Sequence, residues 1–138
     1  MFFREARQIL AAAAVLAAGT LLAGSLWAAG DDVTTVATEK LPNVPGKSIT
    51  AIVVNYVPGA KSVKHHHAGS VLAYVLSGEI RSENSATGPA KVYKAGETFF
   101  EPPGSEHLVS ENASATEPAS LLAIFVAEDG AQLTIYDE

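Results

Sequence analysis

Short apolar segments rich in Val, Ile, Leu and Phe recur along this 138-residue chain, and Gly, Pro, Ser or Asn interrupts them about every 8–12 residues. No segment after residue 30 keeps a helical period. The pattern therefore predicts an all-β fold, a sandwich or barrel of about seven or eight short strands. The expected strands cover residues 49–57, 71–76, 79–81, 91–94, 98–101, 107–110, 121–127 and 133–136, with polar loops over 82–89 and 111–119.

The first 30 residues have a different character. Arg4 and Arg7 precede an uncharged stretch, residues 9–29, which is rich in Ala and Leu and ends in small residues. This layout is typical of a secretory signal peptide over residues 1–30, so we expect an exported protein, periplasmic or secreted. The alternative is an uncleaved anchor, because the stretch is long enough to span a bilayer. A membrane contact is expected only in that case.

The remaining chain is expected to divide into an N-terminal arm over residues 31–48, which is polar and contains prolines, and one domain over residues 49–138. The formal net charge is −6 and the basic residues form no stripe, so nucleic acid is not an expected partner. The chain has no cysteine, which excludes a disulfide framework and thiolate metal sites. A small molecule is the expected partner.

All four histidines lie in two places, His65 to His67 and His107. Residues two apart on a strand face the same way, so His65 and His67 share a face and His66 points to the other. The same alternation places Val71 on the inner side. A metal ion needs ligands that converge on one point, and His107 is the third histidine available. Spacing alone leaves an alternative open, a solvated histidine loop with His107 capping a turn.

The first histidine segment resembles the first motif of the cupin superfamily. That motif has a Gly, five residues, His-x-His, three or four residues, a Glu, six residues and a Gly. Here Gly59 precedes the histidines by five residues, Val71 follows them after three, and Gly78 follows after six more. The spacing matches, but Val71 stands where the family has its glutamate.

The second segment resembles the second cupin motif, which has a Gly, five residues, Pro-x-Gly, two residues, a His, three residues and an Asn. Here Gly96 is followed after five residues by Pro102-Pro103-Gly104, and His107 comes two residues later. Asn112 lies one place late. Together the motifs span residues 59–112.

The resemblance implies a small single-domain cupin, a double-stranded β-helix (jelly roll) with a metal at its centre and frequent pairing as a homodimer. It is a three-histidine variant that lacks the motif-1 glutamate, with His65, His67 and His107 as metal ligands. Some cupins of this kind are iron dioxygenases. We therefore expect one divalent ion, Fe²⁺ before Mn²⁺, Ni²⁺ or Zn²⁺, since imidazole suits several metals.

If the protein is an enzyme, the resemblance implies a dioxygenase-like oxidoreductase that acts on a small anionic chelating substrate. Without the glutamate the site would keep a charge of about +2 and more open positions. The alternatives are a non-catalytic module that binds a small molecule or a metal, and a cupin that no longer holds metal. Glu101 is a second source of a carboxylate, because alternation from His107 puts it on the ligand face and Glu106 on the other. Its alternative reading is a solvated strand end.

Overall fold

The protein is described by a computed structural model over residues 31–137, and the signal peptide expected at 1–30 lies outside this range. The described residues form strands and no helix. Residues 31–137 therefore contain no helix with the length and apolar character needed to cross a membrane. The strands are β1 (Asp31–Lys40), β2 (Lys47–Tyr56), β3 (His65–His66), β4 (Ser70–Ser77), β5 (Glu79–Asn84), β6 (Gly88–Lys94), β7 (Thr98–Glu101), β8 (Glu106–Asn112), β9 (Ala119–Glu128) and β10 (Ile135–Tyr136).

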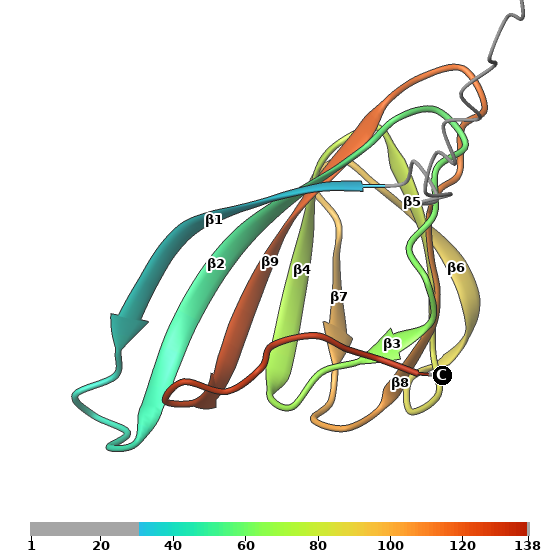
Figure 1. Cartoon of the computed structure of the whole chain (residues 1–138). Coiled ribbons are helices and arrows are strands. Elements are labelled where there is room, and N and C mark those ends of the chain that lie inside the picture. The colour runs from blue at the N-terminus through green and yellow to red at the C-terminus, as the bar shows by residue number, and fades with distance from the viewer. Residues whose placement is uncertain (1–30, 138) are drawn as a thin grey trace, which may run out of the picture.

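The strands form two five-stranded sheets, one in the order β1-β2-β9-β4-β7 and the other in the order β10-β3-β8-β5-β6. Figure 1 shows the first sheet as a curved wall and the second closing the barrel opposite it. All pairs between neighbouring strands are antiparallel. This is the double-stranded β-helix that the sequence predicts, so the all-β expectation is confirmed.

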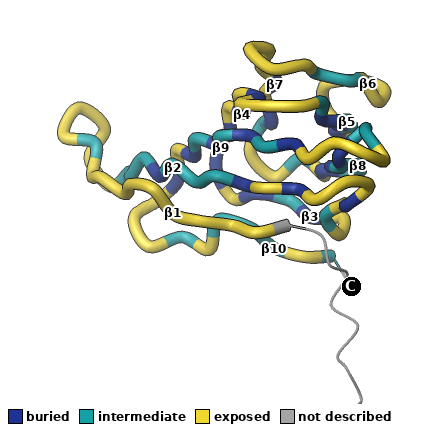
Figure 2. The backbone as a smooth tube through the Cα atoms, turned by 90° about the horizontal axis from the view of Figure 1, so that it is seen from above, coloured by how far each residue is buried: buried dark blue, intermediate teal, exposed yellow. Residues whose placement is uncertain are grey.

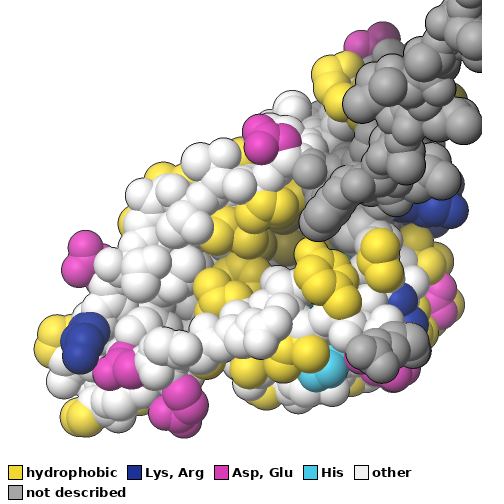
Figure 3. Space-filling view, in the orientation of Figure 1, with side chains coloured by type: hydrophobic (Ala, Val, Ile, Leu, Met, Phe, Trp, Pro, Cys, Tyr) yellow, Lys and Arg dark blue, Asp and Glu magenta, His cyan; other side chains and the backbone are white. Residues whose placement is uncertain are grey.

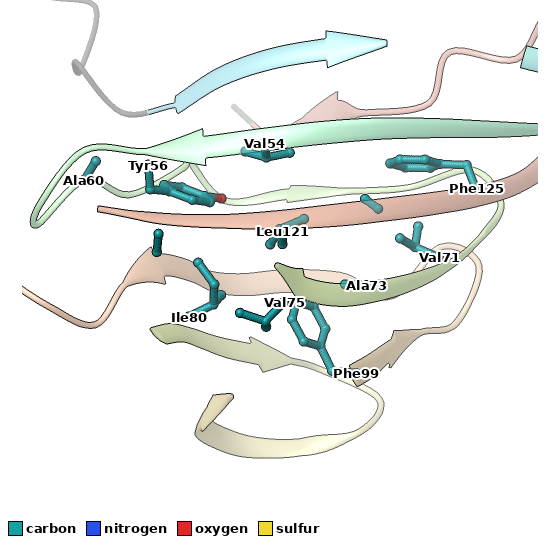
Figure 4. Packing of buried hydrophobic residues seen from close by; sticks show 12 residues of the cluster. Val54, Tyr56, Ala60, Val71, Ala73, Val75, Ile80, Phe99, Leu121 and Phe125 are labelled. Carbon is teal, nitrogen blue, oxygen red and sulfur yellow. The ribbon is translucent and has the colours of Figure 1, made fainter. Parts of the chain in front are cut away.

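Alternation of side chains along β4 explains how the core forms. Val71, Ala73 and Val75 are almost fully buried, whereas Leu72 and Tyr74 between them are exposed. A strand that covers a core on one face requires this period of two. The buried positions of β4 meet those of the opposite sheet, and Figure 4 shows them packed around one interior.

Two expected loops are shorter than the sequence suggests. Strand β5 continues to Asn84 and β6 begins at Gly88, so most of the loop expected at 82–89 is strand. Strand β8 likewise reaches Asn112. Ser82, Asn84 and Asn112 are all buried, because polar side chains here turn inward and find partners inside the protein. Asn112, for example, donates hydrogen bonds to the carbonyl oxygens of Val57 and Glu117, at 3.2 and 2.7 Å. The prediction of loops was therefore wrong at these positions, because it took polar residues to be solvent-exposed.

Strand β1 occupies much of the region expected as an arm. It pairs with β2 from Asp31↔Tyr56 to Lys40↔Ser48, with one irregularity between Thr35 and Ala37. Figure 2 shows that β1 is exposed along its course, unlike the strands behind it. Strand β1 thus extends one sheet at its edge.

Candidate metal site

Two neighbouring strands bring the three predicted ligands together. His65 on β3 pairs directly with His107 on β8, and His67 follows immediately after β3. The three side chains are buried, with 7%, 4% and 5% of their surface exposed. One ring nitrogen from each lies within 4.8 Å of the others. His66 is half-buried, and its Nδ1 lies 2.9 Å from Asp137 Oδ1 instead.

Backbone carbonyls fix the orientation of the first two rings. His65 Nδ1 donates a hydrogen bond to the Val63 carbonyl at 2.6 Å, and His67 Nδ1 donates one to the Leu133 carbonyl at 2.8 Å. A histidine whose Nδ1 carries the proton has its lone pair on Nε2. Both rings therefore keep Nε2 available as a ligand atom, which is the arrangement found in most histidine metal sites.

The third ring is held by a serine from β5. His107 Nε2 lies 2.8 Å from Ser82 Oγ, and both residues are buried. The other nitrogen, Nδ1, is left as the ligand atom of this ring. None of the residues 31–137 gives His107 Nδ1 a well-aligned hydrogen bond, although the atom is fully buried. An unsatisfied buried nitrogen costs free energy, so this atom is the most direct sign of a missing ligand.

Burial also keeps two of the histidines neutral. Removal from water lowers the pKa of His65 and His67 below the ordinary value, and the neighbouring His107 lowers both further. The hydrogen bonds to the carbonyls and the charge of Glu101 act in the opposite direction without overcoming burial. A neutral imidazole has the free lone pair that a metal ion requires.

Glu101 lies at the same point and is only 3% exposed. Its Oε2 is 3.0 Å from His107 Nδ1 and 3.8 Å from His67 Nε2. Burial would raise the pKa of this carboxyl, but its polar contact with His107 and the surrounding histidines lower it overall. The reading of Glu101 as a solvated strand end is therefore wrong. Val71 is 1% exposed and belongs to the core, so the carboxylate comes from β7.

A cavity of about 200 Å³ lies in front of these four side chains. Its wall is largely apolar, and Figure 3 shows hydrophobic side chains lining a hollow in this face of the molecule. Among the described residues that line it, none is Lys or Arg. Hydroxyl groups lie beside the apolar wall, where Tyr56 Oη is 2.8 Å from Ser62 Oγ and 2.9 Å from Ser110 Oγ. The volume is below the roughly 300–1,000 Å³ of pockets for drug-sized ligands, so the cavity suits a small molecule.

The ligand atoms of these residues are of the types that bind metal ions, and the distances between them are close to those of a bound ion. Two ligands of one ion, each about 2.1 Å from it, lie at most about 4.2 Å apart. The histidine nitrogens, within 4.8 Å of one another, need to approach by a few tenths of an ångström at most. Imidazole nitrogens with a carboxylate oxygen form a donor set suited to iron, manganese, nickel or zinc. The three histidines are thus positioned for metal binding.

The partners that orient the rings were missed in the sequence. Ser82 had a signal, because it shares the inward face of β5 with the buried Ile80. The carbonyls of Val63 and Leu133 had none, since every residue has a carbonyl. The contact of Leu133 with His67 depends on how the C-terminal segment crosses to β3, where Ile135 pairs with His66.

Comparison with known proteins gives a consistent assignment. A family model described as the cupin domain matches residues 52–125. Germin-like protein subfamily 2 member 2 of Arabidopsis thaliana is 32% identical over 100 residues, which are 70% of this chain and 45% of that protein. The chain therefore spans less than half the length of this curated relative.

Two solved structures extend the comparison. One is an uncharacterized conserved protein with a double-stranded β-helix domain from Klebsiella pneumoniae, 22% identical with a TM-score of 0.60 over 79% of this chain and 86% of that chain. The other is oxalate decarboxylase of Bacillus subtilis, a protein with Mn(II) centres, 27% identical with a TM-score of 0.59 over 78% of this chain and 28% of that chain. At 22% identity, the similarity to the Klebsiella pneumoniae protein shows a shared fold.

Proposed function

Because this chain belongs to the cupin family, we propose that it binds one divalent metal ion through His65, His67 and His107 and acts with it on a small molecule in the barrel cavity. One observation carries the proposal. Each ring gives one nitrogen to a protein partner and turns the other toward a shared buried point. For His107 the second nitrogen, Nδ1, is fully buried without a hydrogen-bond partner among the described residues, and such a nitrogen costs free energy unless a ligand satisfies it.

The metal proposed is Fe²⁺ or Mn²⁺. A carboxylate beside three imidazoles adds a hard oxygen donor, and oxygen donors suit iron and manganese better than a site of nitrogen alone. The Bacillus subtilis oxalate decarboxylase that resembles this chain has Mn(II) centres, which supports the same choice. Ni²⁺ and Zn²⁺ are the alternatives that a metal analysis would separate from these two.

The substrate proposed is small, with a chelating oxygen group and an apolar body. A divalent ion in this site would supply a Lewis acid that holds and polarises such a group. The described lining contains no Lys or Arg, so the protein itself offers an anionic group no second cation. The apolar wall, with Ile52, Leu121 and Phe125, would pack the rest of the molecule and exclude water. We place the reaction among dioxygenase-like oxidations.

Elemental analysis of protein purified without an affinity tag tests the metal. We expect about one ion per chain after growth in metal-replete medium. His67→Ala should abolish binding, whereas His66→Ala should leave it unchanged, because the ring of His66 contacts Asp137 and not the shared point. A metal-free wild-type protein, or equal losses in both variants, would overturn the proposal.

Oxygen consumption tests the reaction. Metal-loaded protein is mixed with diketones, catechols and thiols, and uptake above that of His67→Ala protein would identify the substrate class. Tight binding of the same compounds without uptake would replace the oxidation by a non-catalytic binding role.

We also propose export on the pattern of residues 1–30. Fractionation of the cells, followed by mass spectrometry of the intact protein, should find a chain outside the cytoplasm that begins near residue 31. A full-length chain in the cytoplasmic fraction would contradict export, and a full-length chain in the membrane fraction would favour the uncleaved anchor.

A further inference from the structure

Glu101 lies among the histidines but is not at a ligand position of either cupin motif. We propose that Glu101 is the fourth protein ligand of the metal, so that β7 supplies the carboxylate in place of position 71. This inference rests on the proposed metal site. Its direct support is the position of Oε2, which lies 3.0 Å from His107 Nδ1 and 3.8 Å from His67 Nε2.

The distances suit ligands that share one ion. Two donor atoms about 2.1 Å from an ion lie about 3.0 Å apart at a right angle and about 3.4 Å apart at a tetrahedral angle. The 3.0 Å from Oε2 to His107 Nδ1 equals the first value. The 3.8 Å to His67 Nε2 exceeds the second but stays below the largest separation of about 4.2 Å that two such donors can have. Oε2 therefore needs little movement to join the histidines.

The alignment argues against a simple hydrogen bond between Glu101 and His107. Their atoms are 3.0 Å apart, yet within residues 31–137 the buried Nδ1 of His107 has no aligned hydrogen-bond partner. His107 Nε2 is already engaged by Ser82 Oγ. A nitrogen and an oxygen at this distance without an aligned hydrogen bond have the spacing of two ligand atoms of one ion.

The burial of the Glu101 carboxylate also favours a cation at this point. A carboxylate that is 3% exposed needs a compensating positive charge or several hydrogen bonds. In the described part of the chain no Lys or Arg forms an ion pair with Glu101. Asn84 Nδ2 donates to Oε2 only at the long distance of 3.5 Å. The other groups near this carboxylate are the site histidines themselves, His107 and His67. A divalent cation at the shared point would compensate the charge of Glu101 while the histidines stay neutral as ligands.

Strand pairing explains how position 101 replaces position 71. Val71 on β4 and Glu101 on β7 are direct partners in the antiparallel ladder. Such partners point to the same face with their Cβ atoms about 4.5–5.5 Å apart. A glutamate side chain at either position can therefore reach the same region of the barrel. The site would then hold one negative charge, and its net charge with a divalent ion would be about +1 rather than +2.

Metal affinity in matched variants tests the inference. Glu101→Gln keeps the size of the side chain and removes its charge, and Glu106→Gln makes the same change at an exposed position that pairs with Lys64. Mn²⁺ dissociation constants come from competition with a chelator, and thermal unfolding of the metal-free proteins verifies that each is folded. We expect Glu101→Gln to bind Mn²⁺ about 10–100-fold more weakly than the wild type. Glu106→Gln should differ from the wild type by about twofold or less.

A crystal structure of the Mn²⁺-loaded wild type separates a ligand from a residue that only positions His107. An oxygen of Glu101 about 2.2 Å from the ion would support the inference. An ion held by the three histidines with that carboxylate more than about 3 Å away would overturn it and leave the proposed metal site intact. Equal affinities of Glu101→Gln and Glu106→Gln would do the same. A wild type that binds no Mn²⁺, Fe²⁺, Ni²⁺ or Zn²⁺ would overturn both proposals together.

Discussion

The hydrogen bond between Ser82 and His107 offers a sharp test of how the protein prepares its site. Ser82 Oγ lies 2.8 Å from His107 Nε2, and the residues are 5% and 4% exposed. Ser82→Ala removes the hydroxyl and leaves the ring nitrogen buried without a partner. An unsatisfied buried group of this kind costs about 1–3 kcal/mol. At about 4 °C per kcal/mol for a domain of this size, the Tm of the metal-free protein should fall by about 4–12 °C.

The same substitution should weaken metal binding. Ser82 orients the ring of His107, so that Nδ1 faces the other two histidines. Loss of a group that orients a ligand commonly costs about 10–100-fold in metal affinity. In free energy this is about 1.4–2.7 kcal/mol of binding. The effect on affinity should exceed any effect explained by lower stability, since the dissociation constant is measured on folded protein.

Ser77→Ala is the matched control. Ser77 Oγ also lies 2.8 Å from a partner, Ser120 Oγ, but this pair is exposed. It lies at the other end of β4 from Val71 and does not line the cavity that contains the histidines. Chelator competition for Mn²⁺ and thermal unfolding are measured for both variants. The reasoning is refuted if Ser82→Ala binds Mn²⁺ as tightly as Ser77→Ala, because His107 would then hold its orientation without the serine.

Three further results are expected. Burial lowers the pKa of His65 and His67 below 6.5, so as the pH falls the unfolded chain binds protons before the folded one does. The metal-free protein should therefore lose stability as the pH falls from 7 towards 5, as measured by thermal unfolding. A Cβ at Gly69 would lie 2.2 Å from a backbone carbonyl oxygen of β9. Gly69→Ala should therefore lower the free energy of unfolding by about 1–3 kcal/mol, as measured with denaturant. It should also weaken metal binding, because the adjacent histidine segment has to move. Val71 and Glu101 are ladder partners, so the double variant Val71→Glu with Glu101→Val should regain most of the Mn²⁺ affinity that Glu101→Val alone loses. A double variant that binds Mn²⁺ no more tightly than Glu101→Val would contradict the spatial equivalence of the two positions.

The sequence predicted the elements whose signal is local. The alternation of β4 and the turn after it can be read from adjacent residues, and the structure has Val71, Ala73 and Val75 inside with Tyr74 outside. The same period of two separated His66 from His65 and His67. Local patterns succeed here because the pleat of a strand depends only on the strand itself.

The sequence failed where polar residues face inward. The strand end at Asn84 was assigned to a loop because Ser, Asn and Thr commonly mark loops. Inside this barrel, Ser82 and Asn84 are buried because the site provides polar partners, His107 for the first and Glu101 for the second. Composition reports what a residue prefers on average, and a functional interior is the place where that average does not hold.

The position of the carboxylate could not be derived by counting along the motif. A motif records spacing in one dimension, whereas a sheet places Glu101 directly opposite Val71 although thirty residues separate them. Nothing adjacent to residue 71 in the chain indicates that partner, because the register between β4 and β7 follows from which face of each strand is buried in the core. A valine in the glutamate position therefore did not mean that the site lacked a carboxylate. In a barrel, the absence of a ligand from a motif has to be judged against the residues across the ladder, and here the facing residue is a buried glutamate whose oxygen lies 3.0 Å from a histidine of the site.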